Sequence, residues 1–442
     1  MRALFGTDGI RGEAGVPPLD DGTVSRIGAA LVAALVDAEM GPPISVAVGC
    51  DTRASSPEIV RALAGGVAAA GGRTRFAGVV PTPAVAYLVA LTDADAGVVV
   101  SASHNPWRDN GIKIFSSEGR KLPDAVEIDI ARRIATSSPA SPPAEVHRDL
   151  LLGAEYVAHL VRSLPHRLDG LKVVIDAAHG AAFEVAPAAF GAAGAEVVAR
   201  NVAPDGRNIN EGCGALHSEG MTRAVIETGA SLGIALDGDA DRIIVADDTG
   251  TLLDGDDVLY LWTLELEREG RKPAAVVGTV MSNWGLERAL RERGVLLIRA
   301  AVGDRYVVEE MEKSGALLGG EPSGHLIHAD LTTTGDGTLT GLHVAALVAA
   351  SGRPLSAQPR FVHTPQVLKN VRVRAKTPFD AIPGFAARRR VAEERLAGNG
   401  RLLLRYSGTE ALARVMVEGA DAALVDSVAR DLADALRESL GA

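Results

Sequence analysis

Three aspartates follow an apolar run in the segment SLGIALDGDADR. Asp237, Asp239 and Asp241 supply hard oxygen ligands, and the small residues between them let the loop curl so that the carboxylates converge. Because neither Cys nor His accompanies them, the set favours magnesium over zinc, and Arg242 adds an anion-binding cation beside the metal. The alternative interpretation is an acidic turn in solvent.

A second polar loop closes the strand-like segment VVVSASHNPW. Serine is a poor nucleophile unless it is activated, and the Ala and His that flank Ser103 do not fit a hydrolase nucleophile elbow. A phosphoserine held against a metal is another use of the same residue, with Lys113 as a nearby cation or proton carrier. The alternatives are a strand-ending turn bonded to its own backbone and a solvated surface lysine.

The segment GGEPSGH combines a carboxylate, a hydroxyl and an imidazole with glycines that allow close approach of a ligand. Glu321 and Ser323 suit neighbouring sugar hydroxyls, which both donate and accept hydrogen bonds. His325 suits proton transfer near neutral pH, although a single histidine is by default structural.

A fourth loop, RYSGTEALAR, lies between two apparent strands. Hydroxyls, free backbone N–H groups and flanking arginines make a phosphate cradle, whereas the alternative is an exposed hairpin turn. The residues concerned are Arg405, Ser407, Gly408, Thr409 and Arg414.

Short Val-rich strands alternate with helical segments in three successive series, which predicts α/β domains with mainly parallel, mixed sheets. Each of the first three loops ends one series, where α/β sheets usually bind ligands. After the segment SGRPLSAQPRFVHTPQ the pattern changes to a smaller α+β domain. The predicted domains are residues 1–150, 151–252, 253–362 and 363–442, with a hinge near Gly352 to Gln366.

A chain of 442 residues is too long for one hydrophobic core. The net charge of -11, without a dense Lys/Arg block, disfavours nucleic acid and anionic membranes as partners. The start of the sequence lacks the features of a signal peptide, no apolar run is long enough for a membrane span, and only Cys50 and Cys213 are present. We therefore expect a cytoplasmic protein.

The four loops together resemble the marks of the α-D-phosphohexomutase superfamily, in the order SASHNP, DGDADR, GGEPSGH and RYSGTE. The resemblance spans nearly the entire chain. Within the superfamily, the segments FGTDGIRG, VGTVMSNWGLE, TTTGDG and RVMVEG are most similar to those of bacterial phosphoglucosamine mutases. The resemblance implies three similar α/β domains and a smaller C-terminal one around a central cleft.

The resemblance also implies the roles of single residues. Ser103 would carry the phosphate and join Asp237, Asp239 and Asp241 around one Mg²⁺ per subunit. Glu321 and Ser323 would bind sugar hydroxyls, and the RYSGTE loop would hold the phosphate that does not react. The groups surrounding the transferring phosphoryl group would be Arg11, His104, Lys113 and Arg242.

The reaction implied is the reversible isomerisation of glucosamine 6-phosphate and glucosamine 1-phosphate through a 1,6-bisphosphate, on the route to UDP-N-acetylglucosamine and cell wall precursors. Glucosamine or glucose 1,6-bisphosphate would prime Ser103, and the enzyme would be a monomer or homodimer. Three alternatives stay open: a phosphomannomutase or phosphoglucomutase of the same fold, a metal-dependent sugar phosphatase, and a non-catalytic sugar-phosphate binding protein.

Overall fold

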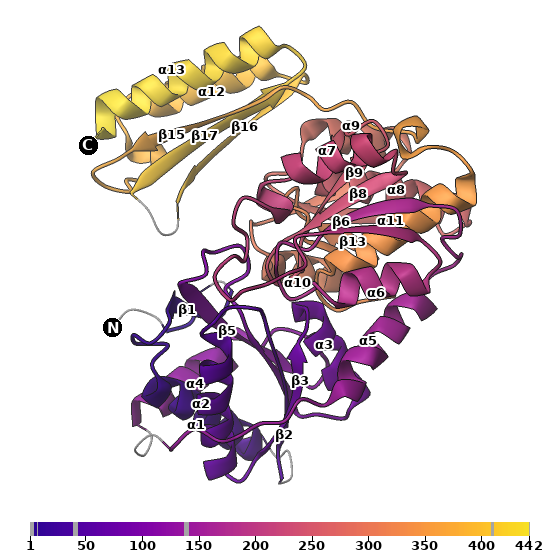
Figure 1. Ribbon diagram of the computed structural model, residues 1–442. Helices are drawn as coiled ribbons and strands as arrows, with labels where there is room; N and C mark the ends of the chain where they lie inside the picture. The colour runs from indigo at the N-terminus through magenta and orange to yellow at the C-terminus, as the bar shows by residue number, and fades with distance from the viewer. Residues whose placement is uncertain (1–3, 7, 39–42, 137–140, 408–410, 442) are drawn as a thin grey trace.

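The computed structural model describes residues 4–6, 8–38, 43–136, 141–407 and 411–441 (Figure 1). Three α/β units follow one another along the chain, and the C-terminal unit stands apart at the upper left of the view. Four sheets of mixed or antiparallel strands confirm the predicted fold class. No helix within the described ranges is long and apolar enough to cross a membrane.

The N-terminal sheet has the strand order β1-β5-β4-β2-β3. β2, β3 and β4 pair in parallel, while β5 and β1 form an antiparallel edge. The strands are β1 Ile10–Glu13, β2 Ser45–Cys50, β3 Arg73–Val79, β4 Ala96–Val100 and β5 Asp109–Ser116. The helices are α1 Asp21–Asp37, α2 Ser56–Ala69, α3 Thr82–Leu91, α4 Asp124–Thr136 and, leading into the next unit, α5 Leu150–Arg162.

The second sheet repeats this plan in the order β10-β9-β8-β6-β7, with β6, β7 and β8 parallel and an antiparallel edge. Its strands are β6 Lys172–Asp176, β7 Glu196–Arg200, β8 Leu232–Leu236, β9 Ile243–Asp247 and β10 Leu252–Leu253. Its helices are α6 Val185–Ala192, η1 Gly214–Leu216 and α7 Glu219–Thr228.

The third sheet has the order β12-β11-β13-β14, and only its last pair is antiparallel. Its strands are β11 Ala275–Thr279, β12 Leu296–Ala300, β13 Leu318–Gly320 and β14 Leu326–His328. Its helices are α8 Gly255–Arg268, α9 Trp284–Glu292, α10 Asp304–Ser314, α11 Gly337–Ser351 and the short η2 Leu355–Ala357.

The C-terminal unit is an antiparallel sheet, β15-β17-β16, with two helices on one face (Figure 1). Its elements are β15 Gln366–Arg372, η3 Phe379–Ala381, α12 Phe385–Leu396, β16 Gly400–Tyr406, β17 Leu412–Gly419 and α13 Ala422–Leu440. We call the four units domains I to IV, and the predicted boundaries near residues 150, 252 and 362 stay predictions.

The clusters of buried apolar side chains do not follow the four domains one to one. One cluster of buried side chains runs through the first three domains and includes Val85, Phe190 and Leu342, and domain I has a second cluster of its own, which includes Leu31 and Leu63. Domain IV has a cluster of its own, which includes Val415 and Leu432. Domains I to III are therefore joined by shared apolar packing, whereas domain IV is held to them in another way.

Candidate active site

The acidic loop follows β8 and is buried. The ligand oxygens of Asp237, Asp239 and Asp241 all lie within 4.8 Å of one another. Ala240 adopts a left-handed backbone with φ of 55°, which a small residue tolerates better than a bulky one, and a Cβ on Gly238 would lie 2.5 Å from the carbonyl oxygen of Ser103. The small residues between the aspartates are thus needed for both the turn and its contact with the serine loop.

The charges of this loop call for a cation. Burial and the neighbouring Asp241 and Asp239 hold the pKa of Asp237 well above its ordinary value. The Oδ1 atoms of Asp239 and Asp241 are buried without a hydrogen-bond partner. Three converging carboxylates with unpaired oxygens fit a hard divalent cation. The cation would offset the repulsion between the carboxylates and would give the unpaired oxygens a partner.

Ser103 lies against this loop. Its hydroxyl donates to Oδ2 of Asp237 at 2.6 Å and lies 3.3 Å from Nδ1 of His104. Ser103 itself has a left-handed backbone with φ of 52° and is 1% exposed. The strained turn aims the hydroxyl at the carboxylates instead of at solvent.

A buried ion pair that the sequence reading missed holds the serine turn in place. Arg53 pairs with Asp51 and donates to the carbonyl oxygens of Ser103 at 2.9 Å and Asn105 at 2.8 Å. Ser101 donates to Asp51 at 2.6 Å and accepts from the backbone of Ser103 at 3.0 Å. The sequence did carry a sign of this ion pair: in the segment CDTR, two charged residues directly follow an apolar strand, and charged residues are rarely buried.

Lys113, on β5, is the cation at the centre. Its Nζ lies 2.9 Å from Asp239, 3.0 Å from Asp241 and 3.2 Å from Asp8. Burial opposes the charge, but these carboxylates outweigh it and hold the pKa of Lys113 well above its ordinary value. The side chain is therefore a fixed ammonium and not a solvated surface lysine.

Arg11, Arg242 and His104 lie around the same centre. Arg11 pairs with Asp8 and donates to the carbonyl oxygen of Ala102 at 3.3 Å. Nε of Arg242 lies 3.8 Å from Asp241. Burial and these two arginines lower the pKa of His104, so its ring is neutral near pH 7. The predicted cations are thus brought together with Ser103.

The segment GGEPSGH packs directly on the acidic loop. Arg242 and His325 form a bridge between the two backbones, and a Cβ on Gly324 would collide with the carbonyl oxygen of Ile243. Glu321 is buried and accepts from the backbone of Gly303 at 3.0 Å. Ser323, in contrast, is exposed.

His325 is buried between two loops. Its Nδ1 lies 3.8 Å from Oδ2 of Asp241, and its Nε2 accepts from the backbone N–H of Gly335 at 3.0 Å. A Cβ on Gly335 would lie 2.5 to 2.6 Å from three atoms of the ring. Gly335, in the segment TTTGDG, therefore sets the position of His325, although the sequence reading gave it no role.

A charged chain that was also missed joins domain I to domain III. Lys121 pairs with both Asp8 and Asp304, and Asp304 lies 3.9 Å from Nε2 of His325. Thr82 adds a bond from α3 to Oδ2 of Asp239 at 2.6 Å. Asp8 lies in the segment FGTDGIRG, which was noted for its resemblance without a role for the aspartate, and the other residues come from separate elements.

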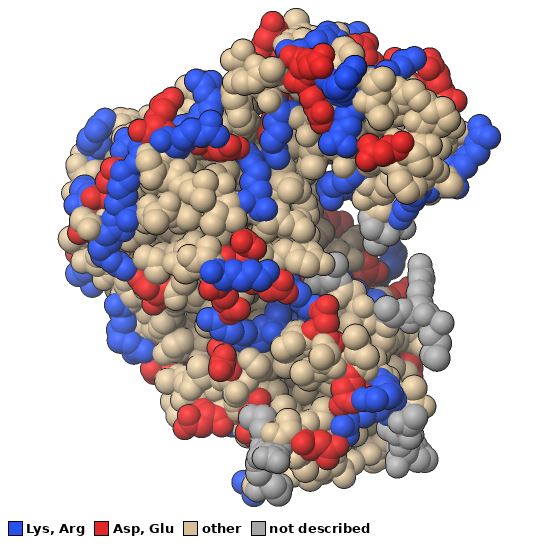
Figure 2. Space-filling view, turned by 180° about the vertical axis from the view of Figure 1, so that it is seen from behind, with Lys and Arg blue, Asp and Glu red and all other residues tan. Residues whose placement is uncertain are grey.

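The predicted phosphate loop belongs to domain IV. Arg405 and Arg414 are direct partners across β16 and β17, and burial together with Arg414 lowers the pKa of Arg405. Ser407 is buried and its carbonyl oxygen accepts from Lys376 at 2.6 Å. Gly408 and Thr409 lie outside the described residues. Figure 2 shows the surface hollowed between domain IV and domain I, with acidic and basic side chains inside.

The sequence matches four consecutive domain descriptions of one family: phosphoglucomutase/phosphomannomutase domain I at residues 2–141, domain II at 154–250, domain III at 254–362 and the C-terminal domain at 368–435. The chain belongs to this phosphohexomutase family.

Among relatives of this phosphohexomutase, a phosphoglucosamine mutase from Anaeromyxobacter dehalogenans is 46% identical over 459 residues and covers 100% of both chains. One from Salinispora arenicola is 47% identical over 447 residues, covering 99% of each. A phosphoglucomutase/phosphomannomutase family structure from Burkholderia thailandensis has a TM-score of 0.81 at 26% identity and covers 99% of this chain and 98% of its own.

Proposed function

We propose that this protein interconverts glucosamine 6-phosphate and glucosamine 1-phosphate through a phosphate carried on Ser103. The observation that carries the proposal is the 2.6 Å bond from the Ser103 hydroxyl into a buried cluster of three carboxylates, with the Lys113 ammonium on its other side. The identity to phosphoglucosamine mutases over the full length supports glucosamine as the sugar.

Asp237, Asp239 and Asp241 would hold one Mg²⁺ together with the oxygen of Ser103. When bound, the ion would neutralise charge that develops on the transferring phosphoryl oxygens. The ammonium of Lys113 and the guanidinium groups of Arg11 and Arg242 act in the same way. Because these cations are fixed before the reaction, they cost no reorganisation when the charge develops.

In the first half-reaction the bond between phosphorus and Oγ of Ser103 breaks, and a bond to the free C1 hydroxyl of glucosamine 6-phosphate forms. Oγ regains a proton, and the neutral ring of His104, 3.3 Å away, is placed to exchange it. We assign proton transfer at the sugar hydroxyl to His325, whose Nε2 would have to exchange its bond from Gly335 for the sugar hydroxyl. Glu321 and Ser323 hold other sugar hydroxyls.

In the second half-reaction the 1,6-bisphosphate turns around and returns its 6-phosphate to Ser103. The group in domain IV must therefore hold either phosphate while the other reacts. Arg405 and Arg414 supply fixed positive charge for this, and Ser407, Gly408 and Thr409 supply hydroxyl and backbone donors. Glucosamine or glucose 1,6-bisphosphate replaces a phosphate that Ser103 has lost.

We further propose a cytoplasmic enzyme that works as a monomer or homodimer, supplies amino sugar for UDP-N-acetylglucosamine, and needs neither nucleic acid nor a membrane. The predicted hinge near Gly352 to Gln366 would let domain IV follow the turning intermediate by motion beyond Thr364, where Asn283 fastens the linker.

Phosphorus NMR tests the substrate. Purified protein with Mg²⁺ and catalytic 1,6-bisphosphate is given glucosamine, glucose or mannose 6-phosphate at matched concentration, and the anomeric phosphate is followed. We expect glucosamine 6-phosphate to react fastest. Faster conversion of a neutral hexose phosphate would instead assign the protein to the phosphomannomutases or phosphoglucomutases.

Intact mass tests the phosphoserine. Incubation with glucosamine 1,6-bisphosphate should add one phosphate to the wild type and none to Ser103→Ala. A phosphatase that uses Asp237 as its nucleophile would release inorganic phosphate even in Ser103→Ala. A protein that only binds sugar phosphates would gain no mass.

A further inference from the structure

Three segments that the proposed reaction does not use meet where domain IV joins domain III. They are VMSNW at residues 280–284, the start of β16, and the end of β17. Glu418, a carboxylate at the end of β17, is 0% exposed. It lies far in sequence from the residues of the phosphate-transfer centre. A buried carboxylate costs free energy unless it is paired, so its partners indicate its purpose.

Both oxygens of Glu418 are engaged. One pairs with Nε of Arg401 on β16 at 2.6 Å, and the other accepts from the backbone N–H of Trp284 in domain III at 3.1 Å. Arg401 also donates to the carbonyl oxygens of Val280 at 2.9 Å and Ser282 at 3.3 Å. The Glu418–Arg401 ion pair of domain IV is thus hydrogen-bonded to the backbone of a single turn of domain III.

That turn is itself fixed from within domain III. The backbone N–H of Asn283 donates to Asp256 at 2.6 Å, and Arg299 donates to the carbonyl oxygen of Ser282 at 2.6 Å. The Asn283 side chain caps α9 by accepting from Gly285 at 2.8 Å. The turn is therefore a rigid seat for the ion pair.

The linker into domain IV is fastened to the same turn. The Asn283 side chain accepts from the backbone of Thr364 at 3.0 Å and donates to its carbonyl oxygen at 3.1 Å. A Cβ on Gly285 would collide with the carbonyl oxygen of Val362. Linker and ion pair therefore share one attachment point, the turn at residues 280–285.

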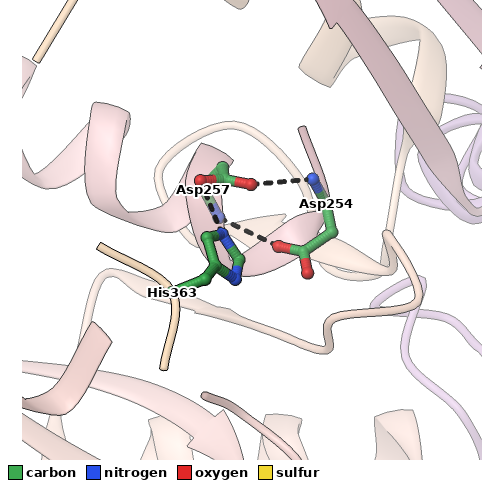
Figure 3. Close-up of side chains that lie close together, drawn as sticks. All are labelled: Asp254, Asp257 and His363. Atoms are coloured by element: carbon green, nitrogen blue, oxygen red, sulfur yellow. Dashed lines mark hydrogen bonds and ion pairs between the residues drawn. The ribbon is translucent and has the colours of Figure 1, made fainter. Parts of the chain in front are cut away.

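Figure 3 shows a further linker contact, from Nε2 of His363 to Asp257 at 3.0 Å. Asp254, Asp257 and His363 are close enough to hold a metal ion. However, Asp254 and Asp257 already accept the backbone N–H groups that begin α8, and a helix N-terminus disfavours a cation. We interpret the contact as one more fastening of the linker.

Because domain IV has a separate apolar core, these polar contacts set its direction. Arg401 and Arg405 are four residues apart on β16, about 13 Å along an extended strand. We propose that Glu418 is a positioning residue: with Arg401, it fixes the direction from which domain IV presents Arg405 and Arg414 to the substrate phosphate. The inference rests on the proposed role of that loop.

Two changes disturb the seat from opposite sides. Glu418→Gln removes the charge that pairs with Arg401 but keeps an acceptor for Trp284. Gly285→Ala pushes on the linker without changing any charge. Glu438→Gln is the matched control, because Glu438 is an exposed glutamate of the same domain, 69% exposed, beside Arg388.

The position of domain IV is measured by spin-label distances between Ser117→Cys in domain I and Arg390→Cys on α12. The native Cys50 and Cys213 are both buried, so the introduced thiols are the accessible ones. We expect Glu418→Gln and Gly285→Ala each to shift or broaden the distance distribution. Both should also raise KM for the sugar phosphate by about tenfold, with a smaller change in kcat.

Arg405→Ala separates this inference from the proposed function. Suppose that Arg405→Ala raises KM. If Glu418→Gln then fails to change both the spin-label distance and KM, Glu418 does not act by positioning the loop, and the inference is wrong. If Arg405→Ala leaves KM unchanged, the loop does not bind phosphate, so the proposed role of the loop and the positioning inference fail together. In that case a distance shift in Glu418→Gln would still identify the seat itself.

Discussion

The acidic centre and the phosphate loop of domain IV are built differently. The acidic centre receives side chains from three domains that share one apolar cluster, and its carboxylates and Lys113 are buried. The loop of domain IV belongs to a separately cored unit attached through the polar seat at residues 280–285. The region proposed to transfer the phosphoryl group is thus fixed by apolar packing, whereas the direction of the region proposed to hold the other phosphate depends on a few polar contacts.

The strongest test of this comparison removes the nucleophile. Ser103→Ala should lower turnover by more than about a thousandfold, as loss of a covalent nucleophile does in other enzymes. A coupled assay for glucosamine 1-phosphate measures it, and Ser117→Ala, an exposed serine of the same domain, is the control. Residual activity near that of the wild type would place the transfer elsewhere.

Lys113→Met tests the charge balance of the acidic centre. Loss of one partner of a buried ion pair should destabilise the protein by about 3 to 5 kcal/mol, and less so with Mg²⁺, which replaces the lost charge. Thermal unfolding with and without Mg²⁺ measures this. Lys172→Met, at a pair whose Glu196 is 69% exposed, should change stability by less than about 1 kcal/mol. An equal loss with and without Mg²⁺ would contradict the metal assignment.

Asp336 is a buried carboxylate outside the acidic loop, and burial raises its pKa to about 6. The raised pKa means that the folded protein prefers the protonated carboxyl group. The free energy of unfolding therefore falls as the pH rises from the pKa of the unfolded chain, 3.8, through the pKa of the folded protein, about 6. Asp336→Asn removes this loss. The free energy of unfolding of the variant, relative to that of the wild type, should rise by up to about 3 kcal/mol between pH 4 and pH 6 and then stay constant.

Thermal unfolding of Asp336→Asn and wild type across this pH range gives the difference. A difference that stays flat across this pH range would mean that Asp336 is not neutralised by burial.

Gly335→Ala asks how closely the ring of His325 must be placed. A Cβ there would lie 2.5 Å from the ring, and misplacement by about 1 Å can reduce kcat by about a hundredfold. We expect a fall of about 10- to 100-fold in kcat with KM little changed, from steady-state kinetics. Gly191→Ala, where nothing lies within 4 Å, should leave kcat as it is. Normal kcat in Gly335→Ala would remove His325 from the proton transfer.

Arg405→Ala should have the smallest effect, because the loop in domain IV is proposed to hold a phosphate that does not react. We expect KM to rise by about tenfold, or about 1.4 kcal/mol, with less change in kcat. Arg372→Ala, on the exposed side of β15, is the control. A fall in kcat as large as that of Ser103→Ala would mean that the two regions do not divide the work as described.

The sequence predicted what is contiguous along the chain. The acidic loop and the serine loop each carry their functional groups within a few residues after an apolar strand, so both were visible. Asp8 stood in the segment FGTDGIRG without a role of its own, and Lys121 and Asp304 were missed because their pairing depends on the packing of domain I on domain III. Lys113 was identified as a cation, but its burial depends on carboxylates from another domain.

The sequence pattern did not predict every helix and strand separately. α11 is apolar on nearly all sides because it is buried, so it lacks the periodicity that marks a surface helix. The antiparallel edges formed by β5 and β9, which directly follow the functional loops, were not among the predicted strands. Recognition of the four marks supplied the overall architecture that these gaps concealed.

The burial of Ser103 has a consequence for how the enzyme acquires its phosphate. The serine is 1% exposed and sits in a left-handed turn held by Arg53 and Asn210. A protein kinase would have to pull this turn out of the fold before its own catalytic groups could reach the hydroxyl. A small diffusible donor needs no such unfolding. If Ser103 carries the phosphate as proposed, its supply would therefore depend on the pool of a small sugar bisphosphate and not on a protein kinase.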